Sequence, residues 1–295
     1  MITVTGATGN IGRTLVELLA ETGEEVVAVS RQADPAAPAT PGVRRVRADL
    51  GTAESLRPAL DGSRALFLLL GGDLNSRGEH PSALLDLAKA AGVERIVLVS
   101  SQASATRPDA VSHARLREFE TAVRESGREF TVLRPGGFAS NAFAWAESVR
   151  TRRTVVAPFG DVALPVVDPA DIAAVAAAAL TGDGHAGRTY ELTGPEPITP
   201  RRQAEVLAEA LGEDLAFVEL TREQAHAHLA GFMPEEVVTG TLDILGTPLP
   251  AERRVSPDVE QVLGRPAAPF AAWVARNLPA FRSSSVGATV VGSPT

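Results

Sequence analysis

The stretch TGATGNIG, residues 5–12, decides the fold of this chain of 295 residues. It overlaps the end of the apolar run ITVTG (2–6) and leads into the amphipathic segment IGRTLVELLAETG (11–23). Its glycines allow a tight turn and a close approach to a pyrophosphate, which then lies at the N-terminus of the following helix. Strand, glycine loop and helix in this order predict a dinucleotide-binding unit. We expect cofactor contacts in this loop at Gly6, Thr8, Gly9, Asn10, Ile11 and Gly12.

Short apolar runs alternate with amphipathic segments through the first half of the chain. The runs span residues 2–6, 25–30, 43–50, 65–70, 95–100 and 130–135. Nearly continuous apolar strands joined by helices are typical of a parallel sheet covered on both faces. The sequence therefore predicts the α/β class, with a Rossmann doubly wound parallel sheet.

The pattern changes after residue 150. Residues 163–182 predict a short strand and then a helix with Asp168 or Asp171 as its N-cap, and residues 188–194 predict a further strand. Helix-like segments with glycine stops follow. We expect an NAD(P)-binding Rossmann domain at 1–150, the remaining strands and a smaller, mostly helical C-terminal substrate lobe at 151–282, and a flexible tail at 283–295.

Composition excludes several classes of function. The net charge of −8 argues against direct nucleic-acid binding, which needs a basic face. The chain has no cysteine, and His226 and His228 lie on different faces of a helix, so we expect no metal site. With a strand beginning at residue 2 and no long apolar segment, we expect a soluble, cytoplasmic protein with a small-molecule substrate and no membrane contact. A homodimer is left open.

The second strand bears on the choice of cofactor. Where an acidic residue would bind the adenosine ribose of NAD, this strand ends in VSRQ, without a carboxylate. Arg31 can offer its guanidinium to a 2′-phosphate, so we expect NADP(H) in preference to NAD(H). The alternative is that Arg31 is one surface arginine among many. Further cofactor contacts are expected where the later strands end, at Asp49, Leu50, Gly71, Gly72 and Ser100.

Several motifs occur together in one order along the chain. They are TGATGNIG, VSR, ADL (48–50), SGREFTVLRPGGFASN (126–141), VDPADIAAV (167–175), YELTGPEPIT (190–199) and LGRPAAPFAAWVARN (263–277). In this set and order the chain resembles the NmrA-like branch of the atypical short-chain dehydrogenases/reductases. The resemblance implies a Rossmann fold, a bound NADP-type nucleotide and a small C-terminal lobe over a cleft. This branch includes quinone and dye reductases as well as redox-sensing regulators, so the resemblance does not specify the substrate.

The stretch SHARLREFE (112–120) predicts the start of a helix, with His113 and Arg117 four apart on one of its faces, and it bears on catalysis. Tyrosine-dependent members of the wider superfamily use a strand-end serine and then Tyr-x-x-x-Lys on the next helix, whereas here Ser101, His113 and Arg117 fall at that spacing. One interpretation is that Arg117 holds the nicotinamide ribose while His113 donates a proton or hydrogen bond to the substrate. The other is that both are ordinary residues of a solvated helix. Hydride addition to a quinone also gives a product that water can protonate, so no enzymic acid is required.

The loop after the sixth strand, RPGGFASN, is expected to contact nicotinamide and substrate. Pro135 and Gly137 would lie against the cofactor. Phe138, and Asn141 at the start of the next helix, would contact the substrate. The function we favour is an NADPH-dependent reductase of a small, apolar, electron-poor, quinone-like molecule. The alternatives are a non-catalytic NADP(H)-binding regulator, or a redox-neutral biosynthetic enzyme such as an epimerase or dehydratase.

Overall fold

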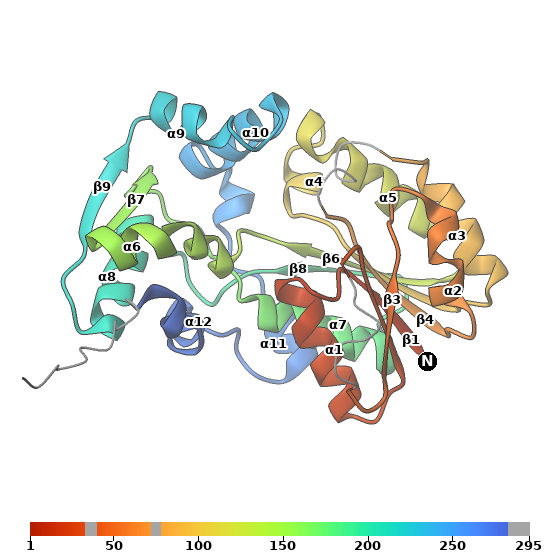
Figure 1. The fold of residues 1–295 in the computed structure, drawn as a ribbon. Helices are drawn as coiled ribbons and strands as arrows, with labels where there is room; N and C mark the ends of the chain where they lie inside the picture. The colour runs from red at the N-terminus through yellow and green to blue at the C-terminus, as the bar shows by residue number, and fades with distance from the viewer. Residues whose placement is uncertain (33–39, 72–77, 283–295) are drawn as a thin grey trace, which may run out of the picture.

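The main sheet of the computed structural model has seven parallel strands, and the glycine loop follows the inner strand β1 (Figure 1). The structure describes residues 1–32, 40–71 and 78–282. The strand order is β3-β2-β1-β4-β5-β6-β8, so the order reverses between β1 and β4, where ligands bind in doubly wound sheets. The strands are β1 (Ile2–Thr5), β2 (Val26–Ser30), β3 (Val43–Arg47), β4 (Ala65–Leu69), β5 (Arg95–Val99), β6 (Glu129–Pro135) and β8 (Arg188–Leu192). The predicted Rossmann fold is confirmed.

Each face of this sheet is covered by its own layer of helices (Figure 1). Along β2, Val26 and Ala28 pack on one face and Val27 and Val29 on the other, so both faces are apolar. One layer contains α1 (Asn10–Glu21), α7 (Pro169–Thr181) and α11 (Asp258–Leu263). The other contains α2 (Arg57–Leu60), α3 (Pro81–Ala90) and α5 (Ala114–Glu125), and a short helix α4 (Ala103–Thr106) follows β5.

A smaller lobe lies beyond the carboxyl edge of the sheet. Its helices are α6 (Ala146–Arg152), α8 (Pro200–Leu211), α9 (Arg222–Leu229), α10 (Glu235–Gly246) and α12 (Phe270–Asn277). A two-stranded parallel sheet of β7 (Thr154–Pro158) and β9 (Ala216–Leu220) adds to what the sequence predicted. The lobe is mostly helical, as expected, whereas the domain boundary at residue 150 stays a prediction.

The strand predicted near residue 163 is wrong. Leu164 makes one antiparallel bridge with Ile198, and Val167 makes one parallel bridge with Phe138. Pro165 has no backbone N–H to donate, and the segment turns between two different partners, so no ladder forms. The segment instead leads directly into the N-terminus of α7.

Two aspartates of the DPAD motif attach the C-terminal segment to the Rossmann part. Asp168 caps α7 by accepting from the backbone N–H of Ala170 at 2.9 Å, which confirms an N-cap here, and it also pairs with Arg276. The buried carboxylate of Asp171 accepts from Arg265 at 2.8 Å and from the backbone N–H of Ala268 at 2.7 Å. Both aspartates are therefore structural.

The described residues offer neither a metal cluster nor a membrane span. No group of three histidine, cysteine or acidic side chains in them is arranged to hold a metal ion. Within the same ranges, no helix combines the length and the apolar character that crossing a bilayer requires.

Candidate nucleotide and substrate site

The glycine loop has the backbone geometry that a pyrophosphate site requires. Gly6 adopts the left-handed region at φ +63°, and its carbonyl accepts from the backbone N–H of Gly9 at 3.0 Å. A Cβ on Gly12 would lie 2.2 Å from the Gly6 carbonyl oxygen, so only glycine lets α1 pack this closely on the loop. Gly9 caps α1 without a side-chain hydrogen bond, so the first-turn N–H groups can serve an anion.

A cavity of about 420 Å³ opens beside this loop at the carboxyl ends of β1, β2 and β4. It unites residues that the sequence placed at the cofactor: Gly6, Thr8, Gly9, Arg31, Asp49, Leu50 and Gly71. Asn10, Ile11 and Gly12 form the first turn of α1 next to it. Gly72, also predicted, lies outside the described residues. The set fits the adenosine and phosphate portion of a dinucleotide.

Ser30 is a cavity residue that the sequence analysis missed. Its side chain is buried at the end of β2 and lines the cavity, and its hydroxyl has no hydrogen-bond partner among the described residues. A buried unpaired hydroxyl is costly unless a ligand satisfies it. Arg31 follows it with an exposed side chain. The sequence does contain a signal for Ser30, because Ser30 and Arg31 form a pair of polar residues at the end of an apolar strand.

Asp49 and Ser100, two further predicted cofactor residues, have partners within the protein. Asp49 accepts from the backbone N–H of Gly51 at 2.9 Å, which shapes the turn after β3. The Ser100 hydroxyl donates to Glu120 at 2.6 Å, and Arg134 forms a bidentate ion pair with the same buried carboxylate. Burial raises the pKa of Glu120, but the hydrogen bonds from Arg134 and Ser100 outweigh burial, so its pKa lies below the ordinary value. The hydroxyl of Ser100 is thus used in a buried polar cluster.

The helix expected from residue 112 begins later than predicted. Val111–His113 form a 3₁₀ turn, and His113 is the N-cap residue of α5. The assumption that His113 and Arg117 lie on one α-helical face is therefore wrong. Arg117 donates to the backbone carbonyls of Ala110 at 2.8 Å and Arg107 at 3.4 Å. Its guanidinium holds the loop that precedes His113, and a contact with a ribose stays a prediction.

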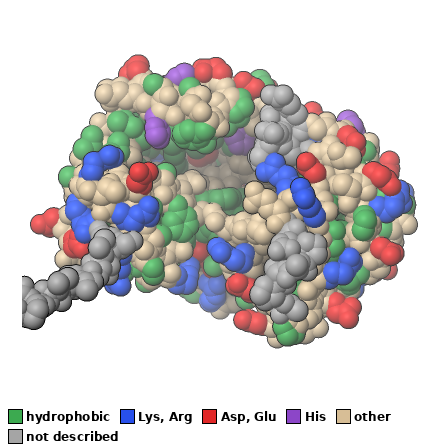
Figure 2. Space-filling model, in the orientation of Figure 1, with side chains coloured by type: hydrophobic (Ala, Val, Ile, Leu, Met, Phe, Trp, Pro, Cys, Tyr) green, Lys and Arg blue, Asp and Glu red, His purple; other side chains and the backbone are tan. Residues whose placement is uncertain are grey.

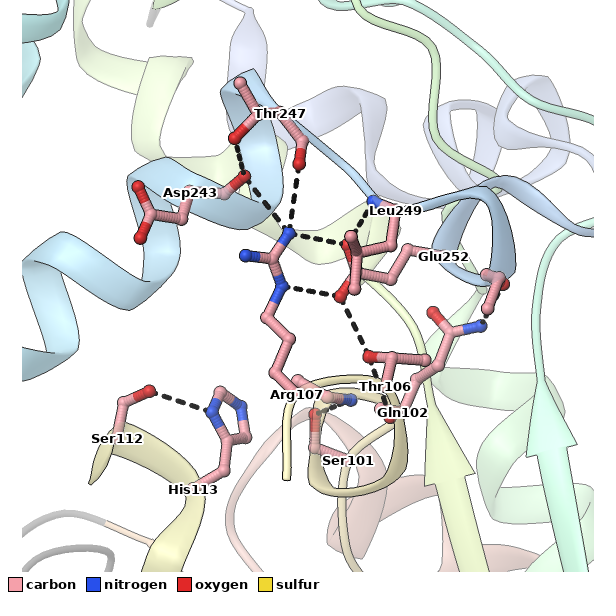
Figure 3. A network of polar contacts seen from close by, with 12 residues as sticks. Ser101, Gln102, Thr106, Arg107, Ser112, His113, Asp243, Thr247, Leu249 and Glu252 are labelled. Carbon is pink, nitrogen blue, oxygen red and sulfur yellow. Dashed lines mark hydrogen bonds and ion pairs between the residues drawn. The ribbon is translucent and has the colours of Figure 1, made fainter. Parts of the chain in front are cut away.

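His113 is a partly buried histidine with a defined partner. Its Nδ1 lies 2.9 Å from the hydroxyl of Ser112 (Figure 3). Burial and then the positive charge of Arg117 lower the pKa of His113, and Arg107 adds to this, while Glu252 opposes it. The imidazole is therefore neutral at neutral pH and can donate a hydrogen bond. Ser101, the third predicted catalytic residue, accepts from the backbone N–H of Ala103 at 3.2 Å at the start of α4.

The loop after β6 is held from both sides. The carbonyl of Pro135 accepts from the backbone N–H of Gln102 at 2.9 Å, and that of Gly137 accepts from Val167 at 2.8 Å. Phe138 packs against the main core, and Asn141 lies exposed within a 3₁₀ helix (Ala139–Trp145), not at the start of an α-helix. Their cofactor and substrate roles stay predictions.

The molecule is hollowed next to this loop. Figure 2 shows an open hollow between the α9–α10 pair and the carboxyl edge of the sheet, with hydrophobic side chains exposed in it. Nucleotide loop, β6 loop and His113 segment all lie at this edge, because parallel strands end on one side of the sheet. The arrangement provides a nucleotide site and an adjoining apolar space.

Comparisons with known proteins agree with this geometry. A family model described as NAD(P)H-binding matches residues 6–183. The chain is 39% identical over 284 residues to (4-alkanoyl-5-oxo-2,5-dihydrofuran-3-yl)methyl phosphate reductase of Streptomyces griseus, covering 95% of this chain and 99% of that protein. It is 32% identical over 287 residues to an NAD(P)H azoreductase of Xenophilus azovorans, covering 95% and 99%. The crystal structure of an NADPH-dependent quinone oxidoreductase from Escherichia coli with NADPH superposes with a TM-score of 0.78 at 28% identity, covering 94% of this chain and 100% of that one.

Proposed function

This chain belongs to the NAD(P)H-binding family and is an oxidoreductase of the atypical short-chain type, and we propose that it transfers a hydride from NADPH to a small, flat, electron-poor acceptor such as a quinone. One observation carries the choice of NADPH. The end of β2 offers the cavity the exposed Arg31 guanidinium and a buried Ser30 hydroxyl that has no partner within the described part of the chain, and the two together suit a 2′-phosphate.

The acceptor class is supported by what the named relatives reduce. Their names specify an oxo-dihydrofuran, an azo compound and a quinone. Each of these has a conjugated, electron-poor π system that can take up a hydride and its electron pair. An apolar space beside the nucleotide site fits such flat molecules.

The roles of the chain's own residues follow from their positions. Bound NADPH supplies the hydride. Gly136 and Gly137 leave room at the end of β6, and Phe138 offers an apolar wall. Neutral His113 would donate a hydrogen bond to the acceptor atom on which negative charge develops, and water would supply the proton. Positioning of the acceptor against the cofactor provides most of the rate enhancement.

The experiment follows NADPH and NADH oxidation with quinones, azo dyes and unsaturated lactones, the last with and without a phosphate group. We expect acceptor-dependent oxidation that is faster with NADPH, and a loss of that preference in Arg31→Ala. An Arg152→Ala variant, altered at an exposed position on α6, serves as the control. Tight NADPH binding without oxidation by any acceptor would contradict the proposal and favour a regulator or a redox-neutral enzyme.

A further inference from the structure

A buried ion pair joins the segment after β5 to the C-terminal lobe. Glu252, in the 3₁₀ turn Pro250–Arg253, is only 3% exposed. Its carboxylate accepts from Arg107 Nε at 2.7 Å and Nη2 at 2.8 Å, from the Thr106 hydroxyl at 2.8 Å, and from the backbone N–H of Leu249 at 2.8 Å (Figure 3). These donors lie in two segments, residues 106–107 and the turn that holds Glu252, which are about 145 residues apart in the sequence. We call the contact between these two segments the joint.

Arg107 extends the joint to the end of α10. Its Nη2 also donates to the backbone carbonyls of Asp243 at 3.3 Å and Thr247 at 3.1 Å. A cation at the last carbonyls of a helix interacts favourably with the helix dipole. Gln102 adds a parallel link, because its side-chain amide donates to the carbonyl of Ala251 at 3.2 Å. The position of α10 is thus fixed from the strand end that also bears Ser101.

One turn earlier in the sequence, α10 also contacts the residue next to His113. A Cβ on Gly240 would lie 2.5 Å from the Ser112 hydroxyl oxygen, so the helix backbone approaches this serine closely. The same hydroxyl makes the 2.9 Å hydrogen bond to Nδ1 of His113. Any displacement of α10 therefore changes the space available to Ser112 and, through it, the imidazole (Figure 3).

We propose that Arg107 and Glu252 are positioning residues, which set the place of α10 over the substrate side of the cleft and thereby the orientation of His113. This inference rests on the proposed function for its substrate. The joint contributes to acceptor binding and turnover, not to nucleotide binding, because it lies away from the cavity beside the glycine loop.

The charge state of Glu252 fits this role. Burial raises its pKa, but the hydrogen bonds from Arg107, from Leu249 and from Thr106 outweigh burial, so its pKa lies below the ordinary value. The carboxylate is therefore ionised at neutral pH. Replacing Glu252 with glutamine puts the N–H groups of its amide against the donors of Arg107, Thr106 and Leu249, which need an acceptor. It also leaves the charge of Arg107 without its partner, which strongly disfavours the folded arrangement.

The test compares Glu252→Gln with the unaltered chain, and with Glu205→Gln in the exposed Arg202 pair on α8 as control. We expect the KM for a quinone to rise about tenfold and hydrogen exchange in residues 235–253 to accelerate about tenfold, with the NADPH Kd changed by less than about twofold. In Gly240→Ala the new methyl group would lie 2.5 Å from the Ser112 hydroxyl oxygen and 3.2 Å from the Ser112 Cβ, so it disturbs the contact between α10 and Ser112 without removing a charge. We expect the same KM and exchange pattern from it.

Three results would overturn the inference. They are unchanged exchange in α10, faster exchange with an unchanged KM, and a rise in NADPH Kd equal to the rise in KM. If the unaltered chain binds NADPH but reduces no acceptor, the proposed function fails on its own. The positioning role of the joint is then tested by hydrogen exchange in α10 and by the imidazole ¹⁵N signals of His113, which must shift in both Glu252→Gln and Gly240→Ala.

Discussion

The nucleotide side of the cleft and its substrate side differ in how far apart in the sequence their contacting residues lie. On the nucleotide side, the residues predicted from the sequence lie at or shortly after the ends of strands, as in the loop 5–12 or at Arg31, and the sheet brings these ends together. On the substrate side, the defining contact joins Arg107 to Glu252. The first side therefore depends on local sequence and the second on how the lobe docks.

The largest effect is expected from breaking the nucleotide side at Gly12. In Gly12→Ala the new methyl group meets the Gly6 carbonyl oxygen at 2.2 Å, so α1 must move away from the loop. We expect the NADPH Kd to rise about a hundredfold or more, with a loss of about 2 kcal/mol of unfolding free energy. Calorimetric binding and thermal unfolding measure both. Gly231→Ala, away from the cavity, is the matched control, since the nearest atom to its methyl group among the described residues is the His228 carbonyl oxygen at 3.4 Å. Equal effects in the two variants would contradict the explanation.

A smaller effect separates the two cofactors. Arg31→Ala removes the proposed partner of the 2′-phosphate, so the NADPH Kd should rise about 30-fold while that of NADH stays unchanged. Fluorescence titration with each nucleotide measures the ratio. A parallel loss for both nucleotides would show that Arg31 does not read the 2′-phosphate.

On the substrate side, His113→Asn tests the hydrogen-bond donor. We expect kcat to fall about tenfold with an unchanged NADPH Kd, because one donor to the developing charge is displaced. Steady-state kinetics with a quinone at saturating NADPH measures it. Unchanged kcat would mean that His113 only packs beside Ser112.

The smallest effect is a pH dependence of stability. Since the folded-state pKa of His113 lies below its ordinary value of 6.5, the unfolded chain takes up this proton first as the pH falls. His113 therefore lowers the unfolding free energy below about pH 6.5 and is neutral in effect above it. Arg117, Arg107 and Glu252 are the charged groups that act on it. Urea unfolding should show a shallower loss of stability on acidification for His113→Asn, and an identical slope would contradict this.

The sequence predicted most of the fold because its signals are local. Glycine spacing and apolar periodicity predicted all seven strands of the main sheet. Seven of the residues that line the cavity were predicted because they lie at or near the ends of these strands. The start of α5 was misplaced because the 3₁₀ turn at Val111–His113 has no sequence signal distinct from a helix start. The bridges at Leu164 and Val167 depend on partners supplied by other segments.

The joint could not be predicted from the residues that form it. Arg107 is one of many arginines, and Glu252 is one of 36 acidic residues. Only the docking of the lobe buries that carboxylate and brings it to the guanidinium. Ser30 likewise appeared as an ordinary strand residue until its hydroxyl proved buried and unpaired among the described residues.

The central claim, hydride transfer from NADPH to an electron-poor acceptor, is tested most directly by isotope transfer. The protein would be incubated with NADPH deuterated at the transferring position of the nicotinamide and an unsaturated lactone, and the product analysed by mass spectrometry and NMR. The account predicts one deuterium bound to carbon in the reduced lactone. Bound NADPH that keeps its deuterium, with this lactone and with every other acceptor left unreduced, would contradict it.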